Sequence, residues 1–237
     1  MEIVLARHAQ PDWEPDGRAV DDPGLTALGH EQAKRAAEAL ASQRFDALYT
    51  SPLRRARETA KPIADALGMP LEERSWLSEL GLPPMQGFSA ERVQAFFRAA
   101  NARPFDRWWE GMPGGENFRD FYQRVSDGVE RLLQDDHQLA VRLSGAQRIW
   151  ELPRNRERIL IVAHEGTNAV LLSHLLGLEP VPFAWVRFSH AWAGISVAQA
   201  LELPGGSLFA LESFNRTDHL ACLRSREDWT RDGRPQA

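Results

Sequence analysis

Three short apolar runs dominate the hydrophobic pattern of the chain, and they lie at residues 3–6, 47–50 and 158–163. Each run has the length of a strand, and none shows a strict alternation of apolar and polar positions. An uninterrupted run is typical of a parallel strand covered on both faces, because a half-solvated strand would alternate. The pattern therefore predicts three buried strands in a mostly parallel central sheet.

Helical periodicity follows each of these strands. The predicted helices are 25–41, 53–67 and 166–176. Thr26 is suited to be an N-cap, whereas Gly68 and Gly177 are suited to end the second and third helices. Later apolar segments at 193–201 and 208–214 predict two more strands, joined as a hairpin. The alternation of strands and helices is typical of the α/β class.

A helical insertion of about residues 85–152 interrupts this alternation. Its amphipathic segments are 90–100 and 118–133. Between them lie Trp108 and Trp109, which would be core residues or would form a lid that excludes water and shapes a substrate pocket. Residues 135–157 are polar and predict an irregular connection.

The composition of the chain mainly excludes certain classes of partner, cross-link and targeting segment. A net charge of −5 gives no general field that would attract nucleic acid, so any anion site must be local. The single cysteine, Cys222, allows no internal disulfide and fits a cytoplasmic protein. The first residues lack a signal-peptide pattern, and no apolar run approaches the length of a membrane span. A homodimer is a possible assembly.

Candidate chemistry gathers where the predicted strands end. Arg7 and His8 follow the first strand, His164 follows the 158–163 strand, and Ser51 and Arg55 follow the 47–50 strand. Taken singly, these residues would be solvated polar groups at strand ends. In open α/β sheets, however, ligands bind beyond the carboxyl ends of the strands. If the strands are neighbours, two histidines and at least two arginines converge on a pocket suited to an anion.

The order of short motifs along the chain adds a resemblance. The motifs are Leu5-Ala-Arg-His-Ala-Gln10, Leu25-Thr-Ala-Leu-Gly29, Ser51-Pro-Leu-Arg-Arg-Ala56, Leu77-Ser-Glu79, Gly114-Gly-Glu-Asn117 and Val162-Ala-His-Glu-Gly166. This ordered set resembles the histidine phosphatase superfamily, the phosphoglycerate mutase-like proteins. The resemblance implies one domain over 1–237, built as a three-layer α/β/α sandwich with the helical insertion as a lid.

The resemblance also implies roles for the residues at the strand ends. His8 would be the nucleophile and would form a covalent phosphohistidine. Arg7, Arg55 and His164 in its cationic form would hold the phosphoryl oxygens. Gln10 would donate one further hydrogen bond, and the first amides of the 166–176 helix would face the same phosphate.

Glu79 matches the position of the general acid in this family. Apolar neighbours such as Leu77, Leu80 and Leu82 would raise the pKa of its carboxyl group, so that it could hold a proton near neutrality. It would protonate the leaving oxygen and later remove a proton from water. The ordinary alternative is one more exposed glutamate.

Several residues depart from the family pattern. Ala9 replaces a glycine, Glu14 an asparagine, and Glu165 a glycine directly after the second histidine. Glu165 would repel phosphate unless it turned outward or paired with an arginine. Glu116 matches an acidic residue of a Gly-Glu-Ser motif in which Asn117 replaces the serine, and capping and catalytic roles are equally open for it.

Three functions fit these observations. The first is a metal-independent phosphomonoester hydrolase acting on a small phosphorylated metabolite, with no cofactor. The second is a phosphoglycerate-type mutase, although no match to the longer substrate-binding insert of such mutases is present. The third is a weakly active phospho-ligand binding protein in which Glu14 and Glu165 have eroded catalysis.

Overall fold

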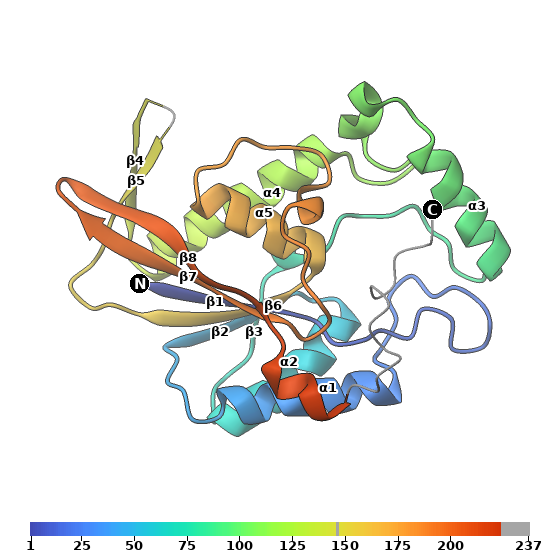
Figure 1. The fold of residues 1–237 in the computed structure, drawn as a ribbon, viewed down its shortest axis with the longest axis horizontal. Coiled ribbons are helices and arrows are strands. Elements are labelled where there is room, and N and C mark those ends of the chain that lie inside the picture. The colour runs from blue at the N-terminus through green and yellow to red at the C-terminus, as the bar shows by residue number, and fades with distance from the viewer. Residues whose placement is uncertain (146, 224–237) are drawn as a thin grey trace.

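The computed structural model describes residues 1–145 and 147–223, and over these residues the strands form one eight-stranded mixed sheet (Figure 1). The strand order is β3-β2-β6-β1-β7-β8-β5-β4. The parallel half contains β1 (Glu2–Arg7), β2 (Ala47–Thr50), β3 (Glu72–Glu73) and β6 (Arg158–Ala163). The antiparallel half contains β7 (Ile195–Leu203), β8 (Gly206–Arg216), β5 (Gln147–Glu151) and β4 (Ala140–Ser144).

The prediction of a mostly parallel sheet is wrong. The three apolar runs do form β1, β2 and β6, and β6 pairs in parallel with both of the others. Beyond β1, however, every neighbouring pair is antiparallel: β1 with β7, β7 with β8, β8 with β5, and β5 with β4. Only two residues separate Leu203 from Gly206, and strands joined by so tight a turn can pair only in the antiparallel sense.

The prediction of an irregular connection over residues 135–157 is also wrong, because this segment supplies β4 and β5. The side chains of β4 are mostly exposed, so its sequence carries no pattern of a buried strand. Backbone pairing with β5 makes it a strand. Trp150 of β5 is fully buried and lies edge-on to Phe209 of β8, with ring centroids 5.5 Å apart. The insertion is therefore helical only up to Asp136.

Helices cover both faces of the sheet (Figure 1). The helices are α1 (Ala27–Leu40), α2 (Arg54–Leu67), α3 (Ala90–Asn101), α4 (Phe118–Arg131) and α5 (Glu165–Leu175). One core joins α1 and α2 to the face that carries Val4, and a second joins α4 and α5 to the face that carries Leu5. Because consecutive residues of β1 both enter a core, its sequence shows no polar alternation.

The predicted helix ends are confirmed. The Thr26 side chain accepts a hydrogen bond from the Gly29 N–H and caps α1. Gly68 ends α2 in the left-handed conformation with φ 63°, and Gly177 adopts φ 68° just beyond α5. No helix among the described residues combines the length and the apolarity that a membrane crossing requires.

Shorter helical turns complete the fold. They are η1 (Ser75–Leu77), η2 (Phe105–Glu110), the π-helical turn η3 (Leu132–Asp136), η4 (Ala184–Val186) and η5 (Asp218–Leu223). α3 lies apart from the sheet, on the side to which the carboxyl end of β1 points (Figure 1). It fully buries only Ala100, whereas α4 contributes Phe121, Val125 and Val129 to the main core. The inserted segment thus contains one peripheral helix and one helix of the sandwich.

Candidate active site

The carboxyl ends of β1 and β6 bring the two histidines together. In the parallel pairing Arg7 lies opposite Ala163, so His8 and His164 follow at equivalent positions on neighbouring strands. Their ring centroids are 5.1 Å apart, and both side chains are buried. β2 lies on the other side of β6, and this places Ser51 beside His164.

The geometry of His8 leaves one ring nitrogen suited to attack. Its Nδ1 lies 2.7 Å from the Ala9 carbonyl oxygen, and because a carbonyl only accepts, Nδ1 carries the proton. The lone pair therefore resides on Nε2. Burial, followed by the nearby cations Arg55 and Arg7, lowers the pKa of His8 well below 6.5. At neutral pH the ring is neutral, which is the nucleophilic form.

His164 has one partnered and one unpartnered ring nitrogen. Nε2 lies 2.7 Å from Ser51 Oγ, whereas Nδ1 is buried without a hydrogen-bond partner among the described residues. Burial, with Arg55, His8 and Arg7 following in that order, lowers the pKa of His164 well below its usual value. Full burial and two adjacent arginines oppose a positive charge on His164, so the cationic form that the resemblance implies stays a prediction for the ring beside a bound phosphoryl group.

Arg55 is a buried cation with incomplete pairing. It is 4% exposed, and its Nε and Nη1 atoms have no hydrogen-bond partner within residues 1–145 and 147–223. The Asp22 carboxylate is 3.8 Å from Nη1, and the Trp13 ring centroid is 5.0 Å from the guanidinium carbon. Burial lowers the pKa of Arg55 to about 10, and Glu79 and Asp22 oppose this shift. A buried guanidinium with open donors is a built site for an anion.

Arg7 lies on the other side of the histidines and pairs with Glu165. Its Nη1 donates to the His190 carbonyl oxygen at 2.5 Å and lies 3.3 Å from Glu165 Oε2. The second Glu165 oxygen accepts a hydrogen bond from Ser189 Oγ at 2.9 Å. Of the arrangements considered for Glu165, the structure shows the pairing with an arginine.

The Glu79 carboxylate lies against the first turn of α5. Its carboxylate accepts hydrogen bonds from the Gly166 N–H at 2.9 Å, the Thr167 N–H at 3.1 Å and its neighbour Leu80 N–H at 3.0 Å. A Cβ on Gly166 would lie 2.5 Å from Glu79 Oε1, so this approach needs a glycine. The α5 amides expected to face the phosphate are therefore engaged by Glu79, whose negative charge suits a helix N-terminus.

The hydrogen bond that Gln10 would donate to phosphate stays a prediction, as does a place for Glu14 in the substrate pocket or lid. The Gln10 amide oxygen accepts from Thr26 Oγ1 at 2.7 Å, and its backbone N–H donates to Gln32 Oε1 at 2.9 Å. Gln10 thus braces the start of α1. Glu14 is exposed in a turn that the Gly17 N–H closes by donating to the Glu14 carbonyl oxygen.

The candidate lid residues Trp108 and Trp109 pack against other parts of the fold. Trp108 lies edge-on to Phe183 with centroids 4.4 Å apart, and its indole N–H donates to the Arg103 carbonyl oxygen. Trp109 lies 4.7 Å from the guanidinium carbon of Arg119. These contacts are those of a hydrophobic cluster at the edge of the core.

Glu116 makes structural contacts rather than contacts with the histidines. Its carboxylate pairs with Arg124 and accepts from the Gly81 N–H at 3.1 Å. Asn117, which replaces the family's serine, caps α4 through a hydrogen bond from the Asp120 N–H.

Sequence reasoning missed two contributors to the site. Ser51 was part of a motif but had no assigned role, although its position directly after a strand was a usable signal. His190, for which the sequence indicates no role, is buried against Ser196 with Nε2 2.8 Å from Oγ. Burial lowers the pKa of His190 to about 3. No motif marked His190, and only the tertiary fold places its carbonyl group on Arg7.

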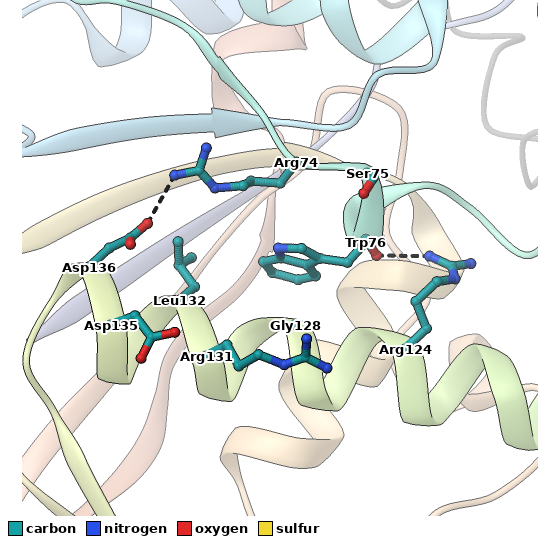
Figure 2. Close-up of a pocket in the computed structure, with 9 residues that line it drawn as sticks. All are labelled: Arg74, Ser75, Trp76, Arg124, Gly128, Arg131, Leu132, Asp135 and Asp136. Atoms are coloured by element: carbon teal, nitrogen blue, oxygen red, sulfur yellow. Dashed lines mark hydrogen bonds and ion pairs between the residues drawn. The ribbon is translucent and has the colours of Figure 1, made fainter.

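A separate cavity of about 460 Å³ lies between α4 and residues 74–76, the segment that leads to Glu79 (Figure 2). Its lining residues are Arg74, Ser75, Trp76, Arg124, Gly128, Arg131, Leu132, Asp135 and Asp136. It contains neither histidine of the candidate site. Among the described residues no three or more histidine, cysteine, aspartate or glutamate side chains are grouped so that they could hold a metal ion.

Comparison with known proteins agrees with this geometry. Residues 3–202 match the model of the histidine phosphatase superfamily, branch 1. The chain therefore belongs to the histidine phosphatase superfamily.

Individual relatives differ in their named activities. The chain is 27% identical to phosphoserine phosphatase 1 of Hydrogenobacter thermophilus, over 76% of this chain and 78% of the relative. It is 31% identical to a 2,3-bisphosphoglycerate-dependent phosphoglycerate mutase of Brucella melitensis, over 75% of this chain and 82% of the relative. A solved structure of a mycobacterial glucosyl-3-phosphoglycerate phosphatase, complexed with VO3, superposes with a TM-score of 0.69 at 26% identity, covering 91% of this chain and 99% of that one.

Proposed function

We propose that this chain is a phosphomonoester hydrolase that acts on a small phosphorylated metabolite through a phosphohistidine at His8. The observation that carries the proposal is the pair of neutral, buried imidazoles 5.1 Å apart, beside an arginine with unpartnered donors. A neutral His8 has its Nε2 lone pair available, and Arg55 offers the charge that a phosphoryl group needs.

In the first step, Nε2 of His8 attacks phosphorus in line with the leaving oxygen, and the phosphorus–oxygen ester bond breaks as the nitrogen–phosphorus bond forms. Arg7 and Arg55 stabilise the negative charge on the equatorial oxygens. The unpartnered Nδ1 of His164 faces the same group once it is protonated. Glu79 delivers a proton to the departing alkoxide.

In the second step, water attacks the phosphorus of the intermediate and releases His8 and inorganic phosphate. Glu79, now a carboxylate, removes the proton from that water. Because arginines and histidines supply the positive charge in this scheme, no metal ion or cofactor takes part.

The peripheral helix α3 and η2 act as a lid in this proposal. The loop of residues 11–24 is tied to the segment before α3, since the Ala19 N–H donates to the Phe88 carbonyl oxygen and the Gly87 N–H donates to that of Ala19. The same loop carries Trp13, which lies over Arg55. The Trp13 ring would thus lie beside the leaving group of a substrate bound at Arg55. Cytoplasmic placement and a lack of nucleic-acid binding complete the proposal, supported by one cysteine and a net charge of −5.

Phosphoglycerate mutase activity is the alternative function with specific support, because relatives of that name match this chain. The carboxylate of Glu165 beside Arg7 favours hydrolysis instead, since it opposes a substrate with a second negative charge near the phosphate. Exchange between 2- and 3-phosphoglycerate, measured against release of free phosphate, separates the two activities.

Labelling of the intermediate tests the proposal. Glu79→Gln can neither donate a proton nor remove one from water, so with an activated aryl phosphate the first step survives better than the second. The variant should accumulate a base-stable, acid-labile label that His8→Ala abolishes, while His164→Ala is still labelled slowly. A label on His164, on a serine or on an aspartate would overturn these roles.

A further inference from the structure

Helix α4 is hydrogen-bonded to the backbone of the segment that carries Glu79. Arg124, in the middle of α4, donates through Nη1 to the carbonyl oxygens of Trp76 at 2.8 Å and Ser78 at 3.0 Å (Figure 2 shows the first). Its Nη2 donates to the carbonyl oxygen of Glu79 itself at 3.3 Å. Three carbonyl groups within residues 76–79 thus accept hydrogen bonds from one side chain.

The remaining donors of Arg124 are held by Glu116. Nε donates to Glu116 Oε1 at 2.9 Å, and Nη2 donates to Oε2 at 2.7 Å. A guanidinium has five N–H donors in a rigid plane, and here each has an acceptor. Glu116 Oε2 also accepts from the Gly81 N–H, so the pair holds the chain on both sides of Glu79.

A second contact on the same helix fixes the start of the segment. The Trp76 ring lies directly against Gly128 of α4, where a Cβ would come within 2.3 Å of the ring. Arg124 and Gly128 lie four residues apart and therefore face the same side of α4. Both line the cavity between α4 and residues 74–76 (Figure 2).

The side chain of Glu79 points the other way, to the first turn of α5. Thr167 adds a bond from Oγ1 to the Ser78 carbonyl oxygen at 3.1 Å, beside its N–H bond to Glu79. Glu79 is therefore held by two helices. Arg124 of α4 binds its backbone carbonyl group, and the first turn of α5 binds its carboxylate.

We infer that Arg124 and Glu116 are positioning residues for the general acid Glu79. This inference rests on the proposed function, in which Glu79 protonates the leaving group. It gives Glu116 a role through Arg124 rather than through contact with substrate. Proton transfer requires the acid within hydrogen-bond reach of the leaving oxygen, and a displacement of about 1 Å can cost 10²-fold in rate.

The leaving group separates this role from a merely structural one. An alkyl phosphate such as glycerol phosphate needs protonation of its leaving oxygen, whereas 4-nitrophenyl phosphate needs little. The quantity to compare is kcat/KM, because it reports transfer to His8. Arg124→Ala should lower kcat/KM about 10²-fold for glycerol phosphate and only about threefold or less for 4-nitrophenyl phosphate.

The chain offers a matched control on the same helix. Glu130 of α4 pairs with Arg148 at 2.8 Å, and the two side chains are 28% and 30% exposed, close to the 21% and 29% of Glu116 and Arg124. Arg148→Ala should lower the melting temperature without changing the ratio of kcat/KM for the two substrates. If Arg148→Ala changes that ratio as much as Arg124→Ala does, the inference is wrong.

A double variant shows through which residue Arg124 acts. Residues that work through one another are non-additive, so Arg124→Ala combined with Glu79→Gln should be no slower on glycerol phosphate than Glu79→Gln alone. Additive losses would overturn the inference. If Arg124→Ala does not fold, Glu116→Gln, which preserves size, and Arg124→Lys, which preserves charge, replace it. Both should lower kcat/KM more for glycerol phosphate than for 4-nitrophenyl phosphate, by a smaller factor.

The failure of the inference and the failure of the proposed function look different. If Glu79→Gln lowers kcat/KM equally for both substrates, the acid role of Glu79 in the proposed function is wrong. If Glu79→Gln lowers kcat/KM mainly for glycerol phosphate but Arg124→Ala lowers kcat/KM equally for both substrates, only the positioning inference is wrong.

Discussion

Glu165 and Arg7 form an ion pair beside the two histidines, with 3.3 Å between the carboxylate and the guanidinium. Arg7 is also held by the His190 carbonyl oxygen, so it keeps an anchor when the carboxylate is removed. We therefore expect Glu165 to compete with a bound phosphate for Arg7, rather than to hold Arg7 in its place.

Glu165→Gln should strengthen inhibition by free phosphate and lower the apparent KM of a phosphate ester. The gain should be up to about fivefold, because partly exposed ion pairs contribute ~1 kcal/mol or less. The amide oxygen of glutamine can still accept from Ser189 Oγ, so the variant keeps this hydrogen bond and removes the acceptor that faces Arg7. Weaker phosphate binding in steady-state inhibition would show instead that Glu165 orders Arg7.

Arg55→Met should stabilise the fold while it destroys phosphate binding. The guanidinium is 4% exposed and has unpartnered donors, and leaving such a group buried costs about 1–3 kcal/mol. Methionine fills similar space without a charge. Thermal unfolding should give a higher melting temperature, whereas titration with inorganic phosphate should show no saturation. A lower melting temperature would mean that Asp22 and Glu79 already satisfy Arg55.

Binding of a dianion should drive proton uptake by the protein. Burial and two arginines lower the pKa of His164 in the free site, and a bound dianion opposes that shift. Sulfate is a suitable probe because its own protonation does not change near neutrality. Calorimetric titrations in buffers of different ionisation enthalpy should show uptake at pH 7 that disappears in His164→Asn. Equal uptake in that variant would move the proton to another group, with His8 the first to examine.

His190 should make the fold sensitive to acid. Its pKa is lowered to about 3, whereas the ring in the unfolded chain titrates near 6.5, so between these values the unfolded state binds more protons. Stability is therefore complete above about pH 6.5 and falls as the pH decreases toward 3, by up to ~1.4 kcal/mol per pH unit. Urea unfolding of His190→Asn should show a shallower loss between pH 6.5 and 5. An unchanged slope would mean that other groups cause the acid sensitivity.

Chelation should leave activity unchanged. The proposed charge neutralisation comes from Arg7, Arg55 and His164, so excess EDTA should not lower the rate of phosphate release. A divalent ion that restored activity after an EDTA-induced loss would contradict the proposed mechanism. The His8→Ala protein provides the background rate for this assay.

The sequence by itself determined three strands of the parallel half, β1, β2 and β6, and the helices that follow them. Short continuous apolar runs, each followed by a helical pattern, are typical of strands covered on both faces, and the side chains of these three strands do enter the two cores. Thr26 and Gly68 set helix ends through local hydrogen bonding and backbone conformation. The pairs Arg7-His8 and Ser51-Pro52 could be expected near one another because parallel strands end at one edge.

Tertiary structure alone decided the antiparallel half and the surroundings of the charged groups. β4 exists because of backbone pairing, which its mostly exposed side chains do not reveal. A glutamate looks the same in a sequence whether it faces phosphate, an arginine or solvent. Only packing placed Glu165 on Arg7, Glu79 on the first turn of α5, and Glu116 on Arg124, because each contact joins segments whose approach depends on the whole core.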